Sequence, residues 1–341
     1  MSRHKREPGL LPRPLAVLGA LALTAGTVAV VRQLPQGTAG RWPPAARPPV
    51  ISSPVVKPLV TGPPTAAFVT FVDTAREPGF DLPAESRRTG VRRYALGHLV
   101  AGGDGCAPKW SGPLDPVAGR IGLLDPGRNP VAGRIGRLRA LGGDAAPVFG
   151  GPGGRELAAT CIRPGGLAAA YRRVVGAFDA DAVDFEVRDS ADRAAVLRRA
   201  RAIRAMQYER RLGVSFTLRL RSYGLTPGDL AMLRATRQEG AEVGTVNLLA
   251  PVESGRLGPV ATAVLAARDQ IARAQGLADP AQAWRRIALT PVLEGEDDLS
   301  ETDARKLAAY ATYHGLAWLS LRGVTPKPDV SRILWRTPPT G

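Results

Sequence analysis

The sequence predicts an α/β protein whose main domain is a closed (β/α)8 TIM barrel, preceded by a membrane-anchor segment and a Pro-rich linker. From residue 66 onward, short apolar and β-branched runs alternate with longer segments of helical periodicity. This is the order of parallel strands that are connected by helices. Eight such units over about 260 residues match the size of a barrel domain. An open doubly wound sheet is the alternative, but no glycine-rich phosphate turn follows the first strand.

Each expected strand is a short apolar run bounded by turn residues. The expected strands comprise residues 67–73, 92–100, 145–150, 182–188, 213–220, 243–250, 286–293 and 316–322. The expected helices comprise residues 166–178, 192–211, 227–238, 259–275 and 300–313. Two of these helices have a start signal in the sequence: Thr226 precedes Pro227, and Ser300 is followed three residues later by Asp303, close to a capping box.

Residues 1–32 are expected to form a cytoplasmic basic tail and an uncleaved signal anchor. Basic residues precede an uncharged apolar run at 15–31, and such flanks stay on the cytoplasmic side of a membrane. Residues 33–65 are rich in Pro and form an extended linker, 66–326 form the barrel, and 327–341 form a C-terminal tail. The barrel would then lie outside the cell on a single-pass membrane anchor. Cleavage within the N-terminal segment, which would give a secreted protein, is the alternative.

The composition limits the classes of partner. The net charge is +16, from 46 basic and 30 acidic residues, which suits an anionic cell-wall polymer or lipid headgroups. A coding bias toward Arg, Ala, Gly and Pro would explain the same composition. Nucleic acid is not expected, because no compact basic cluster with interleaved aromatic residues is present.

Neither a metal nor another cofactor is expected, because two cysteines and three histidines lack the spacing of a zinc site. One disulfide can form if the domain lies outside the cytoplasm.

The fourth expected strand, residues 182–188, carries charged side chains at every second position. Strands of a parallel barrel are buried on both faces and are ordinarily apolar. Because side chains alternate along a strand, Asp184, Glu186 and Arg188 share one face and the apolar residues between them share the other. The apolar face would pack under the helices. The charged face would then point into the barrel toward its C-terminal mouth, where barrel enzymes hold their chemistry. An edge strand with one solvated face is the alternative.

Residues 181–188 read DAVDFEVR and resemble the Asp-Gly-x-Asp-x-Asp-x-Glu motif of the chitinases of glycoside hydrolase family 18. Asp181 and Asp184 match the motif. An alanine replaces its glycine, and Glu186 replaces its third aspartate. Arg188 falls where the family has its catalytic glutamate.

Other segments extend the resemblance along most of the barrel. The matching segments are residues 71–82, 99–112, 148–161, 214–218, 245–250, 288–298 and 316–324. The resemblance implies a disulfide between Cys106 and Cys161. It also implies a set of candidate ligand-binding residues near the strand ends: Asp73, His98, Trp110, Phe149, Glu253 and Arg322.

The family resemblance implies substrate-assisted hydrolysis, in which a glutamate protonates the glycosidic oxygen and the N-acetyl group of the substrate attacks the sugar carbon. Arg188 cannot serve as that acid, because a guanidinium keeps its proton. We expect Arg188 to form ion pairs with Asp184, Glu186 or Asp73 in a closed network. Glu186 is a poor replacement acid, because it lies about 6–7 Å deeper along the strand and a neighbouring arginine should lower its pKa.

Two further family features are missing. Where the family has a Met-x-Met-Asp-Tyr type motif on the sixth strand, this chain has residues 249–253, LAPVE. Where the family has a tryptophan that floors the sugar site on the eighth strand, this chain has Arg322, and Trp318 is expected deeper in the barrel or against a helix. An open groove above Arg188 would favour binding, whereas a mouth filled by Arg188, Arg219 and Arg322 would favour a scaffold.

The expected function is therefore that of a membrane-tethered, chitinase-like domain that is catalytically inactive. It would bind chitin, peptidoglycan or a related polysaccharide outside the cell. An active glycosidase that uses Glu186 or Glu253 as its acid and a protein-interaction scaffold are the alternatives. A tandem repeat, PVAGRIG at 116–122 and again at 130–136, is interpreted as a local insertion inside one loop.

Overall fold

The computed structural model describes residues 67–112, 130–252 and 256–335. The expected anchor at 15–31, the linker, the first copy of the repeat and Glu253 lie outside the described residues. Within the described ranges, no helix is both long enough and apolar enough to cross a membrane.

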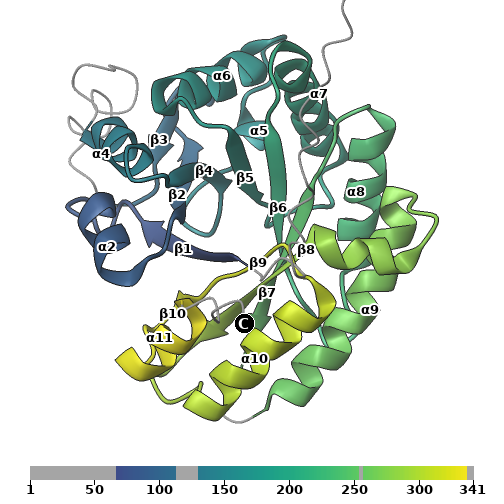
Figure 1. Ribbon diagram of the computed structural model, residues 1–341. Coiled ribbons are helices and arrows are strands. Elements are labelled where there is room, and N and C mark those ends of the chain that lie inside the picture. The colour runs from purple at the N-terminus through teal and green to yellow at the C-terminus, as the bar shows by residue number, and fades with distance from the viewer. Residues whose placement is uncertain (1–66, 113–129, 253–255, 336–341) are drawn as a thin grey trace, which may run out of the picture. The chain divides into compact units, whose positions relative to one another are not determined.

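The described residues form a closed parallel barrel, as the alternation of strands and helices predicts (Figure 1). Each strand pairs in parallel with the next, and β1 pairs with both β2 and β9, which closes the ring. The barrel strands are β1 (Ala67–Asp73), β2 (Arg93–Ala101), β4 (Asp144–Gly150), β5 (Ala182–Glu186), β6 (Gly213–Arg219), β7 (Thr245–Pro251), β8 (Ile287–Leu293) and β9 (Trp318–Leu319). A short strand, β3 (Pro108–Trp110), pairs antiparallel with β2, and β10 (Arg322–Gly323) pairs with β8.

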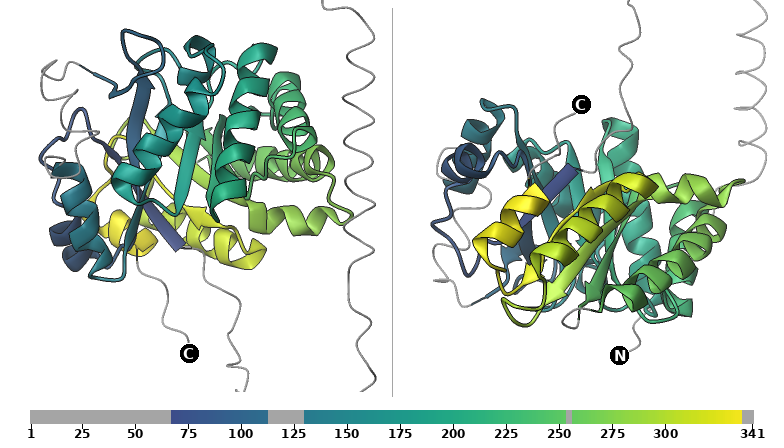
Figure 2. Two further views of the ribbon diagram at one scale, coloured as in Figure 1. Left: turned by 90° about the horizontal axis from the view of Figure 1, so that it is seen from above. Right: turned by 60° about the horizontal axis from the view of Figure 1, so that its bottom comes forward.

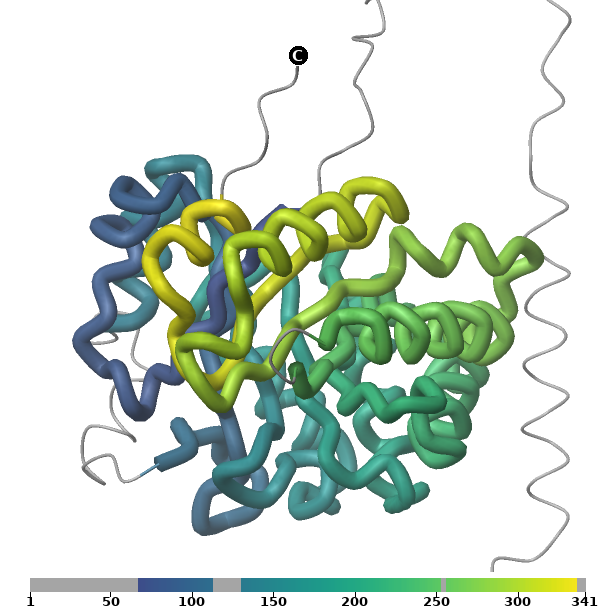
Figure 3. Tube along the Cα trace, turned by 90° about the horizontal axis from the view of Figure 1, so that it is seen from below, coloured from purple at the N-terminus to yellow at the C-terminus, as the bar shows by residue number. Residues whose placement is uncertain are grey.

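Helices surround the barrel on its outer face (Figures 1 and 2). They are α2 (Leu82–Thr89), α4 (Pro130–Arg139), α5 (Leu157–Thr160), α6 (Gly166–Phe178), α7 (Arg193–Glu209), α8 (Pro227–Gln238), α9 (Leu257–Gln275), η2 (Pro280–Arg286), α10 (Glu301–His314) and α11 (Pro328–Trp335). Figure 3 shows the yellow C-terminal helices beside the purple and blue N-terminal elements. The guanidinium of Arg88 in α2 lies over the ring of Trp335 in α11, so both ends of the domain meet at this seam.

The two start signals in the sequence are confirmed. The hydroxyl of Thr226 accepts a hydrogen bond from the backbone N–H of Asp229, whose carboxylate accepts in return from the backbone of Thr226. Ser300 and Asp303 form the same reciprocal capping box at the start of α10. Each box satisfies N–H groups that the first turn of a helix leaves without partners.

Many element boundaries differ from the sequence prediction by one or two residues. β5 ends at Glu186 rather than at residue 188, and the last strand is divided into β9 and β10. Helix α11 occupies most of the segment expected to be a tail, and it packs on α10 because its Val330 and Leu334 are apolar and buried. The second copy of the repeat lies in α4, whose Val131 and Ile135 are buried. That copy therefore belongs to a barrel helix, and the interpretation of a duplication inside one loop is wrong.

The outward face of β5 anchors the core. Phe185 is fully buried, and its ring contacts the rings of Tyr171 on α6, Phe149 on β4 and Phe216 on β6 at centroid distances of 5.1, 5.4 and 5.8 Å. Val183 and Val187 are buried on the same face. This alternation holds the charged residues of β5 on the inner face of the barrel.

A disulfide joins Cys106, in the loop between β2 and β3, to Cys161, which directly follows α5. This is the pairing that the family resemblance implies. The two cysteines are 55 residues apart in the sequence, so the bond ties the extended loop after β2 to the segment after β4.

Replacement of Phe185 by alanine should lower the free energy of unfolding by about 3–5 kcal/mol, because it removes a ring from the centre of an aromatic cluster. Tyr208→Ala is the matched control, because this side chain is 93% exposed, and it should change stability by less than about 0.5 kcal/mol. Guanidinium unfolding measures both. Equal losses in the two variants would show that β5 does not bury this face.

Candidate functional site

A buried charge network lies inside the barrel near the C-terminal ends of the strands. The Nε2 atom of His98 on β2 lies 2.9 Å from the Oε2 atom of Glu186 on β5. A guanidinium nitrogen of Arg322, from β10, lies 3.4 Å from the same oxygen. The exposed fractions of these side chains are 7% for His98, 7% for Glu186 and 12% for Arg322. An ionised carboxylate only accepts hydrogen bonds, so His98 donates its Nε2 proton to Glu186.

Arg322 spans the interior of the barrel from the last strand. Its guanidinium stacks over the ring of Phe71 on β1, a favourable contact between a cation and an aromatic face. Burial lowers the pKa of Arg322 to about 10, and the negative charges of Glu186, Asp184 and Asp73 oppose that shift. Arg322 therefore stays positively charged at neutral pH.

Glu186 is held in its charged form. Burial alone would raise the pKa of this carboxyl. The hydrogen bond from His98 and the positive charge of Arg322 outweigh burial and hold the pKa of Glu186 below its ordinary value. Arg188 lowers it too, but is the last of these influences. The expected direction of the shift is therefore confirmed, although its main cause is not the neighbour in sequence.

Asp184 lies one pleat deeper on β5 and is hydrogen-bonded by two hydroxyls of β6. Ser215 Oγ donates to one carboxylate oxygen and Thr217 Oγ1 donates to the other, the latter at 2.7 Å. Burial raises the pKa of Asp184 to about 6, although both hydroxyls and Arg322 favour the charged form. Asn247 on β7 donates to Thr217 at 3.0 Å and accepts from Thr290 on β8 at 2.7 Å. A polar ladder thus crosses four adjacent strands.

The members of this ladder on β6, β7 and β8 were not among the residues predicted from the sequence. Their signal is the alternation that singled out β5. Ser215 and Thr217 alternate with apolar residues along β6, and Asn247 and Thr290 interrupt otherwise apolar strands. Each of these polar side chains is buried on the inner face of the barrel.

Glycines of the β4–α5 loop make room for the network. Gly151 has a φ of +82°, and a Cβ atom there would collide with the ring of His98. Gly150 has a φ of +91°, and a Cβ atom there would collide with the carbonyl oxygen of Glu186. Both positions require glycine for conformation and for space.

A pocket of about 440 Å³ lies at the barrel mouth over the network. Its wall includes His98, Glu186 and Arg322 together with Asp73 and Leu249. Asp73, at the end of β1, is partly exposed, and its carboxylate lies 3.5 Å from the Nε atom of Arg76. Four of the residues singled out in the sequence, Asp73, His98, Glu186 and Arg322, thus line one pocket.

Two residues predicted to contact a ligand lie in the hydrophobic core instead. Phe149 is on the outer face of β4, with its ring centroid 4.6 Å from that of Tyr171. Trp110 is buried and stacks on Phe178 of α6 at 6.0 Å. Neither lines the mouth pocket, because both point away from the barrel axis. Trp318 lines the barrel interior, as expected for a residue deeper than Arg322.

The described residues contain no group of His, Cys, Asp and Glu side chains suited to hold a metal ion.

Comparison with known proteins shows a resemblance to chitinases. No family model matches the chain. The probable bifunctional chitinase/lysozyme of Escherichia coli strain K12 is 25% identical over 194 residues, which make up 54% of this chain and only 20% of that protein. Two structures of a chitinase domain from Pyrococcus furiosus, one of catalytic site mutants complexed with chito-oligosaccharides, have a TM-score of 0.67 at 22% identity and cover 80% of this chain and 94% of theirs. A GH18 chitinase from Pseudoalteromonas aurantia has a TM-score of 0.54 at 12% identity, with 79% and 98% covered.

The described domain has the chitinase-like fold of glycoside hydrolase family 18. Within this chitinase-like domain, Asp184 and Glu186 face inward as the motif requires, whereas Asp181 is exposed and pairs with Arg210 at 3.1 Å.

Arg188 does not form the ion pairs expected for it. It lies beyond the end of β5 and is exposed, and within the described residues no ion pair to Asp184, Glu186 or Asp73 is formed by it. The prediction that Arg188 closes a salt-bridge network is therefore wrong. The network is closed by Arg322, which reaches Glu186 from the last strand of the domain.

Removal of one charge from this network should be strongly destabilising. Glu186→Gln would leave Arg322 buried without its partner, and we expect a loss of about 3–5 kcal/mol in the free energy of unfolding. Glu301→Gln is the matched control, because Glu301 forms an exposed pair with Arg305, and such pairs contribute less than about 1 kcal/mol. Urea unfolding at pH 7 compares the two variants. A loss at Glu186 no larger than that at Glu301 would contradict the network.

Asp184 should make stability depend on pH in the acid range. Its folded-state pKa of about 6 lies above the ordinary value of 3.8, so the folded state binds this proton more tightly than the unfolded state. The contribution of Asp184 to the free energy of unfolding is therefore largest at a pH below its ordinary pKa. It falls by on the order of 3 kcal/mol as the pH rises to about 6. The difference in unfolding free energy between the native chain and Asp184→Asn, measured from pH 4 to 7, isolates this contribution. A difference that stays constant or rises with pH would exclude the shift.

Proposed function

We propose that the chain is a membrane-tethered, extracytoplasmic protein whose chitinase-like domain binds a chitin- or peptidoglycan-type polysaccharide without hydrolysing it. The observation that carries this proposal is the commitment of Glu186 to His98 and Arg322. This arrangement leaves the mouth pocket with charged and polar groups that can contact a sugar, and it engages Glu186 as an ionised partner of Arg322 rather than as a proton donor.

The proposal that hydrolysis is lost rests on the residues at positions 188 and 186. Residue 188 is an arginine, which keeps its proton at working pH. Glu186 is the nearest inward carboxyl to that position, and its lowered pKa keeps it ionised when an acid catalyst must be protonated. A glutamate that acts as a general acid needs a raised pKa. The pKa of Asp184 is raised. The side chain of Asp184 is however buried deeper in the barrel than the network, and it accepts hydrogen bonds from two hydroxyls.

The mouth pocket supports binding. Of the three arginines named at the mouth, Arg188 and Arg219 are exposed and Arg322 is buried, so they do not jointly fill the mouth. The pocket of about 440 Å³ offers carboxylates, a guanidinium and an apolar wall at Leu249, a mixture that suits the hydroxyl and amide groups of an amino sugar. Structures of this fold from Pyrococcus furiosus are complexed with chito-oligosaccharides, which suggests this class of ligand.

The extracytoplasmic location is proposed from the sequence and the disulfide. The apolar run at 15–31 follows basic residues, and a Pro-rich linker separates it from the barrel. The Cys106–Cys161 disulfide is of a kind that persists in oxidising compartments.

Hydrolysis is tested with N-acetylglucosamine oligomers under conditions where a chitinase turns over. The native chain should release no product above background, because loss of a general acid costs about 10²–10⁴-fold in rate. Arg188→Glu alone should not restore turnover, because the aspartate–tyrosine pair of the sixth strand and the tryptophan of the eighth strand, which the family resemblance implies, are absent as well. Turnover by the native chain that disappears in Glu186→Gln would show an active glycosidase instead.

Binding is tested by isothermal titration of the same oligomers and of peptidoglycan fragments. Leu249→Trp should weaken binding by at least about tenfold, because the larger side chain fills the mouth pocket. Leu265→Trp is the matched control, because Leu265 is 45% exposed on α9, and it should bind like the native chain. Absence of heat with every oligosaccharide would favour a protein-interaction scaffold.

A further inference from the structure

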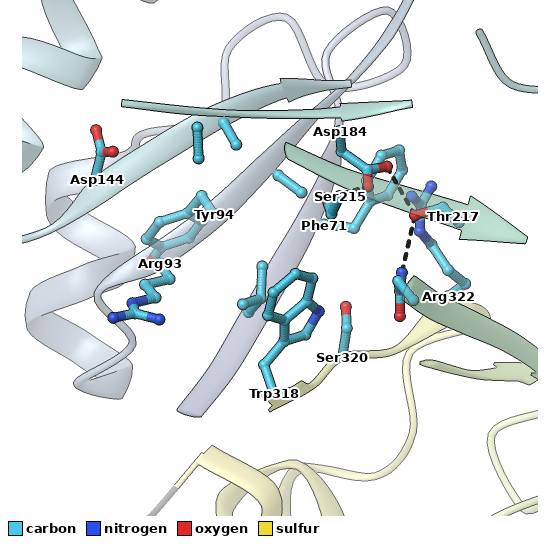
Figure 4. Close-up of a pocket in the computed structure, with 15 residues that line it drawn as sticks. Phe71, Arg93, Tyr94, Asp144, Asp184, Ser215, Thr217, Trp318, Ser320 and Arg322 are labelled. Carbon is cyan, nitrogen blue, oxygen red and sulfur yellow. Dashed lines mark hydrogen bonds between the residues drawn. The ribbon is translucent and has the colours of Figure 1, made fainter. Parts of the chain in front are cut away.

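The lower half of the barrel contains a second cavity, of about 390 Å³. Figure 4 shows Asp184, Ser215, Thr217 and Arg322 at its inner end, with Arg93 and Asp144 at the other. The residues at the outer end come from the starts of the strands, and Arg93 is exposed there. The cavity therefore reaches the face opposite to the mouth pocket.

This part of the barrel is hollow because its inward positions are small. The interior of such a barrel is ordinarily filled by layers of bulky branched side chains. Here the cavity is lined by short side chains from five strands or their extensions: Ala95, Ala146, Ala182, Ser215 and Ser320. An empty apolar volume lowers stability relative to a filled one. A hollow of this size in a barrel core is consistent with a site that is occupied by a ligand.

The walls and the inner end differ in chemistry. Val69, Phe71 and the indole of Trp318 give the cavity an apolar wall. The inner end carries the carboxylate of Asp184, each of whose oxygens accepts one hydrogen bond from a hydroxyl. A carboxylate has about four acceptor sites, so Asp184 can accept further hydrogen bonds from a ligand.

The charge at the inner end is negative. Asp184, Glu186 and Arg322 comprise two carboxylates and one guanidinium. Their sum is one net negative charge in the barrel interior. A buried charge without compensation is unfavourable, and a cationic group beside Asp184 would compensate it.

We propose that this cavity binds a small organic cation, an aromatic or aliphatic amine whose apolar body lies against Trp318 and Val69 and whose ammonium group donates to Asp184. The cavity and the mouth pocket share only Phe71 and Arg322 among the residues that line them. The stacked pair Arg322–Phe71 forms the partition, so the cavity is a separate site from the proposed polysaccharide site.

The test compares two probes with the same ring and opposite charge, tryptamine and indole-3-acetate, by isothermal titration at pH 7.5. Tryptamine should bind more tightly than indole-3-acetate. Asp184→Asn should weaken tryptamine by about tenfold, because it removes a charge-assisted hydrogen bond, and should reduce the preference between the two probes. Equal affinities for the two probes, or no binding of tryptamine, would overturn the proposal.

Cavity-filling variants locate the site. Ala146→Leu should weaken tryptamine by at least about tenfold, and Ala182→Met serves as a second filling variant if the first does not fold. Ala169→Leu is the matched control, because Ala169 is exposed on α6. The mouth variant Leu249→Trp should leave tryptamine binding unchanged. A loss in Leu249→Trp, with none in the filling variants, would place tryptamine at the mouth and overturn the proposal independently of any oligosaccharide result.

Discussion

The pairing of Glu186 with Arg322 is the constraint on which the rest of the site depends. The two charges come from β5 and from the last turn of the barrel, so their ion pair forms only when the ring of strands is closed. His98 adds a hydrogen bond to the carboxylate of Glu186, and the ring of Phe71 lies against the guanidinium of Arg322. A buried ion pair that lacks such additional contacts does not recover its desolvation cost. The ion pair of Glu186 and Arg322 lies between the mouth pocket above it and the cavity below it.

The same pairing is compatible with a domain that has the fold of a chitinase and an arginine at position 188. In a barrel, the scaffold and the site are separable, because strand ends carry chemistry while helices and outward residues carry stability. The outward face of β5 retains its apolar packing around Phe185. On the inward face, Glu186 neutralises Arg322.

The sequence predicted the barrel, the alternation along β5 and the capping boxes at Thr226 and Ser300, because these features depend on local periodicity and spacing. It misplaced Arg188 because the end of a strand is set by pairing with its neighbours, and β5 loses its parallel partners after Glu186. Phe149 and Trp110 were assigned to the wrong face because a residue near a strand end can point either inward or outward. The ion pair between Arg322 and Glu186 joins residues that are 136 positions apart in the sequence. No local sequence pattern encodes such a contact.

The central claim is that Glu186 is a permanently ionised partner of Arg322 and His98, and the pKa of its carboxyl tests this most directly. We would follow the side-chain carboxyl carbon of Glu186 by NMR in protein labelled with ¹³C-glutamate, assigned by comparison with Glu186→Gln, while pH is lowered from 8. A titration below the ordinary value for glutamate is the predicted result. A titration near or above pH 6 would contradict the account, because Glu186 would then be able to act as the missing acid.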